Sequence, residues 1–259
     1  DLNPLKTICK ENNLILLEDA CQAIGGTYNG KQLGTIGDLG CFSFDFVKTI
    51  TCGEGGAVVT NSRSYAENAD KYQDHGHDHV GNDRGAETHP FLGYNYRISE
   101  LHAAVGLGQL EKFEDVLKKQ KQYYTILREE LRSIPEVTFR RVPQDGEESH
   151  AFLNFFLPDE DTTRKAHKAI SNAGVDACFY WFDNNWHYYK KWEHLTEQKS
   201  LGRLPSDVRA NLQDFKTTDF SASDAWMSRT ISSLIKVGWT EDEMKHRAQQ
   251  LKQAILSVL

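Results

Sequence analysis

The pattern of hydrophobic and polar positions predicts one helix followed by three strands in the first sixty residues. A helix is predicted from Pro4 to Asn12, followed by the apolar run Leu14–Leu17, which ends in two acidic residues, the second of them Asp19. A short apolar run with polar residues at its carboxyl end is typical of a buried parallel strand that delivers side chains to a site. Two further strands are predicted at Cys41–Phe46, where hydrophobicity alternates with period two, and at Gly56–Thr60, which is rich in β-forming residues.

A long polar segment and a long helical segment come next. Residues 74–97 are rich in His, Asp, Gly and Asn, and loops of this length inside a compact domain are usually functional or disordered. From Ser99 to Arg132, apolar residues recur at near-helical spacing with Ser99 as the N-cap. This pattern predicts one long helix, whole or broken, that joins two domains with a boundary near residue 125.

The second half of the chain predicts shorter strands and two helices. Strands are predicted at residues 137–141, 151–157 and 175–181. A helix is predicted over 162–173, because Gly174 ends its pattern. The final helix begins at Thr240, which forms a capping box with Glu243. Its apolar positions fall on one face: Met244, Ala248, Leu251, Ile255 and Leu259. The aromatic residues of 179–192 fit a packed core and a substrate-facing wall equally well.

Composition and charge narrow the class of protein. Of 259 residues, 39% are hydrophobic and 26% charged, which is the composition of a folded globular protein and excludes intrinsic disorder. The formal net charge of -7 gives no general electrostatic reason to bind nucleic acid or an anionic membrane. The five cysteines are an odd number without a C-x-x-C pair. We therefore expect neither a disulfide framework nor a zinc ribbon, and a reducing cytoplasm as the setting.

Three residues near the predicted strand ends have complementary chemistry. Asp19 ends one strand, Ser43 lies in the next, and Lys48 follows in a glycine-rich loop. A lysine that is partly desolvated in a loop has a lowered pKa and becomes nucleophilic towards carbonyl groups. A carboxylate can keep an aromatic nitrogen protonated, and a serine with backbone amides can bind a phosphate. Pyridoxal phosphate requires this combination.

Longer sequence strings are more specific than this spacing. They are EDACQ at 18–22, GTIGDLGCFSF at 34–44, GEGGAVVT at 53–60, DHG at 74–76, GYNYRISEL at 93–101 and SASD at 221–224. In this order they closely resemble the DegT/StrS family of sugar aminotransferases, and the resemblance covers essentially the whole chain. It implies an α/β, aspartate aminotransferase-like fold (fold type I). Residues 1–125 would form the carboxyl-terminal portion of a mostly parallel-sheet large domain that binds pyridoxal phosphate, and residues 126–259 a small α+β domain.

The resemblance also implies residue roles. Lys48 would form the Schiff base with pyridoxal phosphate and move the proton between the substrate carbon and the cofactor carbon. Asp19 would pair with the pyridinium nitrogen, Gln22 would pack against or hydrogen-bond the ring, and Ser43 would bind the phosphate. Asn95 would reach the phosphate of the cofactor in the neighbouring subunit, which implies a homodimer with shared active sites.

The same resemblance leaves the substrate open. Related dehydratases have a histidine in place of the lysine, so Lys48 favours transamination, in which glutamate donates the amine and a keto or aldehyde carbon of a sugar accepts it. A nucleotide-linked keto-deoxysugar is the usual acceptor, in amino-sugar biosynthesis for lipopolysaccharide or a natural product. Residues 74–89 also resemble members that aminate a free eight-carbon keto-acid sugar, whose carboxylate would need Arg84 or Arg97. His75 is a further candidate near the substrate entrance.

Alternative interpretations concern the histidines and the whole chain. His75, His77, Asp78 and His79 have metal-ligand chemistry, but no matching ligand set lies elsewhere in an obvious pattern, so we expect no metal. Family members usually have a further large-domain segment before the point that matches Asp1. Nothing in this chain matches that segment, so we expect the sequence to be part of a longer protein. A regulatory or binding relative without turnover, and a sugar dehydratase, are the alternatives to an aminotransferase.

Overall fold

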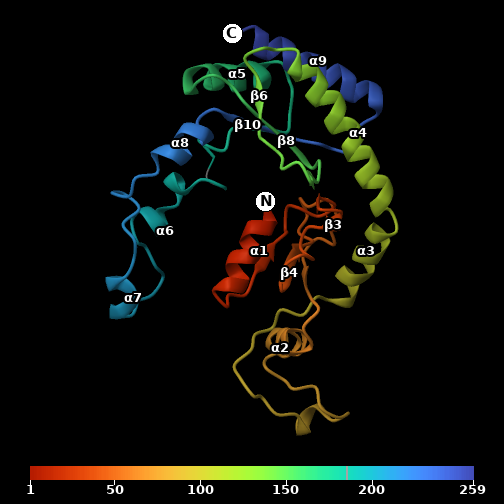
Figure 1. Cartoon of the computed structure of the whole chain (residues 1–259), viewed down its shortest axis with the longest axis vertical. Coiled ribbons are helices and arrows are strands. Elements are labelled where there is room, and N and C mark those ends of the chain that lie inside the picture. The colour runs from red at the N-terminus through yellow and green to blue at the C-terminus, as the bar shows by residue number, and fades with distance from the viewer. Residues whose placement is uncertain (185) are drawn as a thin grey trace. The chain divides into compact units, whose positions relative to one another are not determined.

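The chain contains both helices and strands in the computed structural model, which describes residues 1–184 and 186–259 (Figure 1). Contacts group these elements into two compact units. Unit 1 contains residues 1–121 and 142–151, and unit 2 contains residues 122–141 and 152–259. The chain first passes from unit 1 to unit 2 after residue 121, which lies inside the helical segment predicted from the sequence to join two domains.

Unit 1 is built around a three-stranded sheet in the order β1-β4-β5. Its elements are α1 (Leu2–Glu11), β1 (Leu17–Asp19), β2 (Thr27–Tyr28), β3 (Lys31–Gln32), β4 (Leu39–Ser43), β5 (Gly56–Thr60), α2 (Arg63–Gln73), the 3-10 turn η1 (Arg84–Ala86), α3 (Glu100–Leu110), the start of α4 (Phe113–Arg132) and β7 (Gly146–Glu147). β1 runs parallel to β4, with Asp19 opposite Cys41, and β5 runs antiparallel to β4, with Gly56 opposite Ser43. The carboxyl ends of β1 and β4 therefore meet at one edge of the sheet.

The first predicted strand is displaced. The prediction of a buried strand at Leu14–Leu17 is wrong, because β1 covers Leu17–Asp19 and Leu14 is 58% exposed. Pairing with β4 is set by Asp38, whose carboxylate accepts a hydrogen bond from the backbone N–H of Leu16 at 2.8 Å and whose N–H donates to the carbonyl of Leu16. β1 lies at the edge of the three-stranded sheet, so an apolar run is not enough to bury it.

Glu18 holds the loop before β4 in place. Its buried carboxylate accepts hydrogen bonds from the backbone N–H groups of Gly34 at 2.7 Å, Ile36 at 2.6 Å and Gly37 at 2.6 Å. Hydrogen bonds from backbone N–H groups to a carboxylate are among the stronger ones in proteins. This clamp joins the end of β1 to the start of β4, and so it stabilises the edge at which Asp19 lies.

The predicted long helix is broken into α3 and α4. The predicted N-cap is confirmed, because the Ser99 hydroxyl accepts a hydrogen bond from the backbone N–H of His102 at 3.2 Å. At the end of α3, the N–H of Lys112 bonds to the carbonyl of Gln109, three residues earlier. This tightening of the last turn is common at helix ends, and α4 starts directly afterwards at Phe113.

Unit 2 has a four-stranded antiparallel sheet in the order β6-β8-β10-β9. Its elements are the rest of α4, β6 (Thr138–Phe139), β8 (Phe152–Phe156), α5 (Glu160–Asn172), β9 (Cys178–Phe179), the 3-10 turn η2 (Tyr189–Lys191), α6 (Glu193–Thr196), α7 (Ser206–Ala210), α8 (Ser221–Met227), β10 (Thr230–Leu234) and α9 (Glu241–Leu256). The strand predicted over 175–181 is reduced to the two residues of β9. The strand is short because Ala177, directly before it, has φ of 56°, and because a turn follows it in which the N–H of Asp183 donates to the carbonyl of Tyr180.

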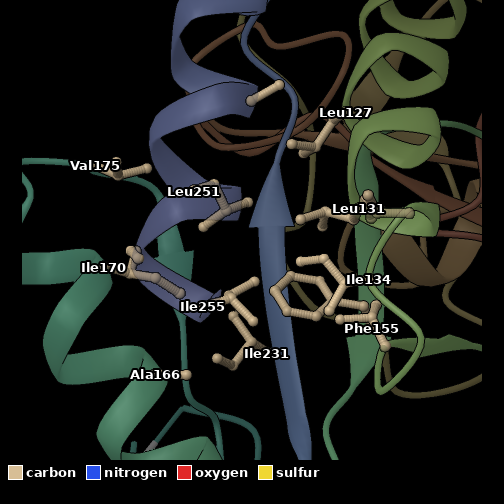
Figure 2. Packing of buried hydrophobic residues seen from close by; sticks show 14 of the residues in the cluster. Leu127, Leu131, Ile134, Phe155, Ala166, Ile170, Val175, Ile231, Leu251 and Ile255 are labelled. Carbon is tan, nitrogen blue, oxygen red and sulfur yellow. The ribbon is translucent and has the colours of Figure 1, made fainter. Parts of the chain in front are cut away.

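The hydrophobic core of unit 2 lies between its sheet and helices α4, α5 and α9. Figure 2 shows its members interleaved: Leu127 and Leu131 of α4, Ile170 of α5, Phe155 of β8, Ile231 of β10, and Leu251 and Ile255 of α9. The predicted capping box of Thr240 and Glu243 is confirmed. The apolar stripe of the last helix is confirmed at Met244, Ala248, Leu251 and Ile255, but it is wrong at Leu259, which lies beyond the helix and is 46% exposed.

No helix within the described residues combines the length and the apolar character needed to cross a membrane.

Candidate active site

The parallel pairing of β1 and β4 brings Asp19 and Ser43 to the same edge of the sheet. Asp19 is the last residue of β1 and lies opposite Cys41, two residues before Ser43, which ends β4. Lys48 follows five residues later, and its charge contributes to lowering the pKa of Asp19. The carboxylate and the amine are therefore within electrostatic reach of each other, as the sequence predicts.

Asp19 is held in its charged form mainly by Cys21. Hydrogen bonds from the thiol and from the backbone N–H of Cys21, the latter at 3.1 Å, lower the pKa of the Asp19 carboxyl, and the charge of Lys48 adds to the effect. Burial and the neighbouring carboxylate raise the pKa of the Cys21 thiol to about 11, so this group keeps its proton at neutral pH. Asp19 is exposed, and it can therefore accept a further hydrogen bond from a cationic donor.

Lys48 lies in a loop whose base is closed by backbone hydrogen bonds. The N–H of Phe44 bonds to the carbonyl of Gly55 at 2.8 Å, and the N–H of Cys52 bonds back to the carbonyl of Phe44 at 3.0 Å. Gly55 has φ of 149°, and a Cβ there would lie 2.8 Å from Ile98 Cδ1, so glycine lets the loop approach the segment before α3. Lys48 is half-buried, and its amine makes no ion pair with any described residue.

Ser43 and Gln22 follow the same strands as the other candidate residues, Ser43 at the end of β4 and Gln22 three residues after β1. The Ser43 hydroxyl oxygen accepts a long hydrogen bond of 3.4 Å from the backbone N–H of Asp45, which leaves its proton free to be donated. Gln22 is exposed three residues after Asp19, and its backbone carbonyl accepts a hydrogen bond from Ser149 at 3.4 Å. Both side chains retain hydrogen-bonding capacity for a ligand.

A second group of polar residues is organised around Asp74, which stands in the sequence only as part of the DHG string. Asp74 is 4% exposed, and its carboxylate accepts hydrogen bonds from Arg84 Nη2 at 2.7 Å and His79 Nε2 at 3.1 Å. Arg97 Nη1 lies 3.1 Å from the same carboxylate. His79 also contacts Asp70, through Nδ1 at 2.6 Å. We call these five residues the Asp74 cluster. Both arginines that the sequence offers for a substrate carboxylate thus have an internal partner.

The charges of the Asp74 cluster shift the pKa values of its members in opposite directions. Burial raises the pKa of the Asp74 carboxyl, but hydrogen bonds from His79 and Arg84 and the charge of Arg97 outweigh this effect and lower it. The pKa of His79 is raised by hydrogen bonds to Asp70 and Asp74 and, to a smaller extent, by the charges of Asp70 and Glu87. The cluster therefore favours a charged imidazolium beside ionised carboxylates.

The His79 imidazole should titrate above the value of about 6.5 typical of an unperturbed histidine. Because the folded-state pKa is raised, the stabilisation from His79 is complete below about pH 6.5 and is lost as the pH rises through the folded value. Nuclear magnetic resonance titration of the His79 ring protons measures this shift. In Asp70→Asn the midpoint should move back towards 6.5, and an unshifted His79 in the unmodified protein would contradict the description of the cluster.

The other predicted histidines have different surroundings. His75 is exposed with φ of 57°, and its backbone N–H donates to the carbonyl of Tyr94 at 3.0 Å. His77 lies 2.8 Å from the Glu87 carboxylate and 3.3 Å from Nε2 of His89. In residues 1–184 and 186–259, no group of three or more His, Cys, Asp and Glu side chains is arranged to hold a metal ion.

A hollow of about 920 Å³ lies between β5 and α2 in unit 1. Its lining is mostly apolar and comes from β4, β5, α2 and Tyr96. Gly55 and Gly56 connect it with the Lys48 loop, but Asp19, Ser43 and Lys48 are not among its lining residues.

Comparison with known proteins places these features in a family. The model of the DegT/DnrJ/EryC1/StrS aminotransferase family matches residues 1–252. The GDP-perosamine synthase of Vibrio cholerae is 40% identical over 135 residues, which cover 52% of this chain and 36% of that relative. A UDP-4-amino-4,6-dideoxy-N-acetyl-beta-L-altrosamine transaminase of Campylobacter jejuni is 36% identical over 123 residues, covering 47% of this chain and 32% of that relative. These matches span about a third of the length of each curated relative.

A solved structure extends the likeness to the whole chain. Helicobacter pylori PseC, an aminotransferase involved in the biosynthesis of pseudoaminic acid, superposes with a TM-score of 0.80 at 20% identity. The superposition covers 99% of this chain and 64% of that one. The predicted α/β fold, aspartate aminotransferase-like of type I, is confirmed. With a family model that extends over nearly its full length, the chain belongs to the DegT/DnrJ/EryC1/StrS aminotransferase family.

Proposed function

We propose that this chain carries the lysine-bearing side of a pyridoxal-phosphate-dependent active site, and that the protein transfers an amino group from glutamate to a keto or aldehyde carbon of a sugar. One observation carries the proposal. The half-buried amine of Lys48, which has no ion-pair partner in the described chain, lies within electrostatic reach of ionised Asp19 at the edge where Ser43 ends β4. Membership of the aminotransferase family supports the same reaction.

The donor set at this edge fits pyridoxal phosphate. Lys48 offers an amine for the carbonyl carbon of the cofactor, and the lowered pKa of Asp19 suits a carboxylate that faces a protonated ring nitrogen. The free proton of the Ser43 hydroxyl suits a phosphate oxygen, and the exposed side chain of Gln22 would meet the ring. When bound, the cofactor supplies an electron sink that stabilises negative charge on the substrate carbon next to the amine.

The residues of this chain then have defined tasks. Lys48 Nζ would hold the cofactor and, when free, would act as the base that takes the proton from the amine-bearing carbon of the substrate and as the acid that gives it back. Asp19 would keep the ring nitrogen protonated, since the lowered pKa of its carboxyl leaves it ionised at neutral pH. Glutamate donates the amine in the first half of the cycle, and the sugar accepts it in the second. The Lys48 amine is the acid and base in both halves.

A nucleotide-linked keto-deoxysugar is the acceptor that we propose. The free eight-carbon keto-acid sugar would need a free arginine for its carboxylate, whereas Arg84 and Arg97 both contact the Asp74 carboxylate. The two curated relatives are named for GDP-linked and UDP-linked sugars. Their names support a nucleotide-linked acceptor in amino-sugar biosynthesis.

The proposal extends to domains, assembly and location. Residues 1–125 would form the cofactor-binding part of the large domain, and residues 126–259 the small domain. The protein would act in the cytoplasm as a homodimer, with Asn95 of each subunit serving the cofactor phosphate of the other.

Incubation of the purified protein with ¹⁵N-glutamate and a panel of keto-sugars tests the proposed reaction. We expect ¹⁵N in the sugar product for a nucleotide-linked keto-deoxysugar, detected by mass spectrometry, and none for the eight-carbon keto acid. Consumption of the keto-sugar without incorporation of ¹⁵N would establish a dehydratase instead. Sugar binding without any turnover would point to the regulatory alternative.

A further inference from the structure

We propose that Arg97, anchored by buried Asp74, is a positioning residue that turns the amide of Asn95 towards the phosphate of the cofactor in the neighbouring subunit. The inference rests on the proposed function, because it concerns the cofactor and the homodimer proposed above. It gives Arg97 a role other than substrate binding, and it gives Asp74 a role that the sequence does not predict.

The hydrogen bond between Arg97 and Asn95 determines which end of the amide is free. Arg97 Nε donates to Asn95 Oδ1 at 3.1 Å. A guanidinium has only donors, so the amide must present its oxygen to Arg97. The NH₂ group of Asn95 is thereby turned away, and its nitrogen makes no hydrogen bond to any described residue. Two N–H donors are therefore available for an anion.

Asp74 fixes the position of the guanidinium. The planar group uses Nε for Asn95 and Nη1 for the Asp74 carboxylate, 3.1 Å away. Planar guanidinium groups are suited to such two-point contacts, whereas a lysine ammonium is not. Asp74 is 4% exposed, and its carboxylate is also held by hydrogen bonds from His79 and Arg84 at the far end of this chain of contacts.

The backbone holds both ends of the chain of contacts together. Asp74 and Asn95 form an antiparallel bridge, and the N–H of His75 donates to the carbonyl of Tyr94 at 3.0 Å. Asp74 and Asn95 are therefore linked twice within one loop, through the Arg97 side chain and through the backbone. An amide NH₂ beside a guanidinium is suited to the oxygens of a phosphate ester, whereas the amide oxygen facing a phosphate would repel it.

The test compares the binding of pyridoxal phosphate with that of pyridoxal, which lacks the phosphate. Absorbance titration gives the dissociation constant of each, and their ratio reports the phosphate contact alone. We expect Asn95→Ala and Arg97→Ala each to reduce the preference for pyridoxal phosphate by roughly tenfold or more, the range for a hydrogen bond to a charged group. The double variant should lose no more of the preference for pyridoxal phosphate than either single variant, because each change removes the same contact between Asn95 and the phosphate.

Two further variants separate positioning from charge and from folding. Arg97→Lys keeps the positive charge but not the two-point contact, so it should lose the preference as Arg97→Ala does. Arg84→Ala removes a contact with the same Asp74 carboxylate but none with Asn95, and it should leave the ratio unchanged. Thermal unfolding of each variant verifies that the fold is retained.

Several outcomes would overturn the inference. A normal ratio in Arg97→Lys would mean that charge alone acts, and additive losses in the double variant would mean that the two residues act separately. An equal loss in Arg84→Ala would mean that the Asp74 cluster only stabilises the loop. A wild-type protein that binds pyridoxal as tightly as pyridoxal phosphate would overturn the proposed function together with the inference.

Discussion

Replacing Lys48 by alanine should reduce amino transfer by roughly 10²–10⁴-fold, the range that general acid–base groups contribute. The proposed role of Lys48 as acid and base explains the size of the loss. Lys48 is the amine at the edge formed by β1 and β4, and its charge acts on Asp19, which would face the ring nitrogen. Steady-state turnover with ¹⁵N-glutamate and the nucleotide-linked sugar measures the loss.

Two control variants make this result specific. Lys48→Arg keeps a positive charge but cannot give up its proton at neutral pH, so it should be as inactive as Lys48→Ala. Lys31→Ala removes an exposed lysine of β3 in the same unit and should retain full turnover. If Lys48→Ala kept turnover within a few-fold of the unmodified protein, the assignment of the acid–base role would be wrong.

Shortening Leu251 to alanine should lower the free energy of unfolding of unit 2 by about 2–5 kcal/mol, the range for large-to-small changes in a core. Leu251 is 1% exposed in the middle of α9 and packs in the cluster that contains Leu131 and Ile231 (Figure 2). Its removal would leave a cavity between the helix and the sheet. Urea unfolding followed by circular dichroism measures the change.

Leu256 in the same helix is a matched control. It is 44% exposed at the last residue of α9, so the same Leu→Ala change there removes little buried surface. We expect a cost below about 1 kcal/mol for Leu256→Ala, in line with substitutions outside the core. Equal costs for the two variants would contradict the packing described for α9.

Local signals explain which elements could be predicted from the sequence. The capping box at Thr240 and the N-cap at Ser99 both form, because each depends on residues within one helical turn. The strand at Gly56–Thr60 has the predicted bounds. The apolar run at Leu14–Leu17 misled the prediction, because strand bounds depend on pairing with β4 and on the contacts of Asp38, which lie more than twenty residues away.

The two groups of polar residues also differ in how far the sequence predicts them. The proximity of Asp19 and Ser43 could be predicted, because the carboxyl ends of parallel strands meet at one edge of a sheet. The Asp74 cluster could not be foreseen, because the sequence shows two arginines and a histidine but not which carboxylate they contact. Burial of Asp74 depends on the path of the whole 74–97 loop, and it changes Arg97 from a candidate substrate ligand into a partner of Asn95.

The proposed bond between Lys48 and the cofactor can be observed by trapping it chemically. The purified protein is incubated with pyridoxal phosphate, reduced with borohydride, digested and analysed by peptide mass spectrometry. We expect the added mass of a reduced cofactor on the peptide that contains Lys48, and its absence from that peptide in Lys48→Arg. Stoichiometric modification of another lysine, or an unmodified Lys48 peptide, would show that Lys48 does not hold the cofactor.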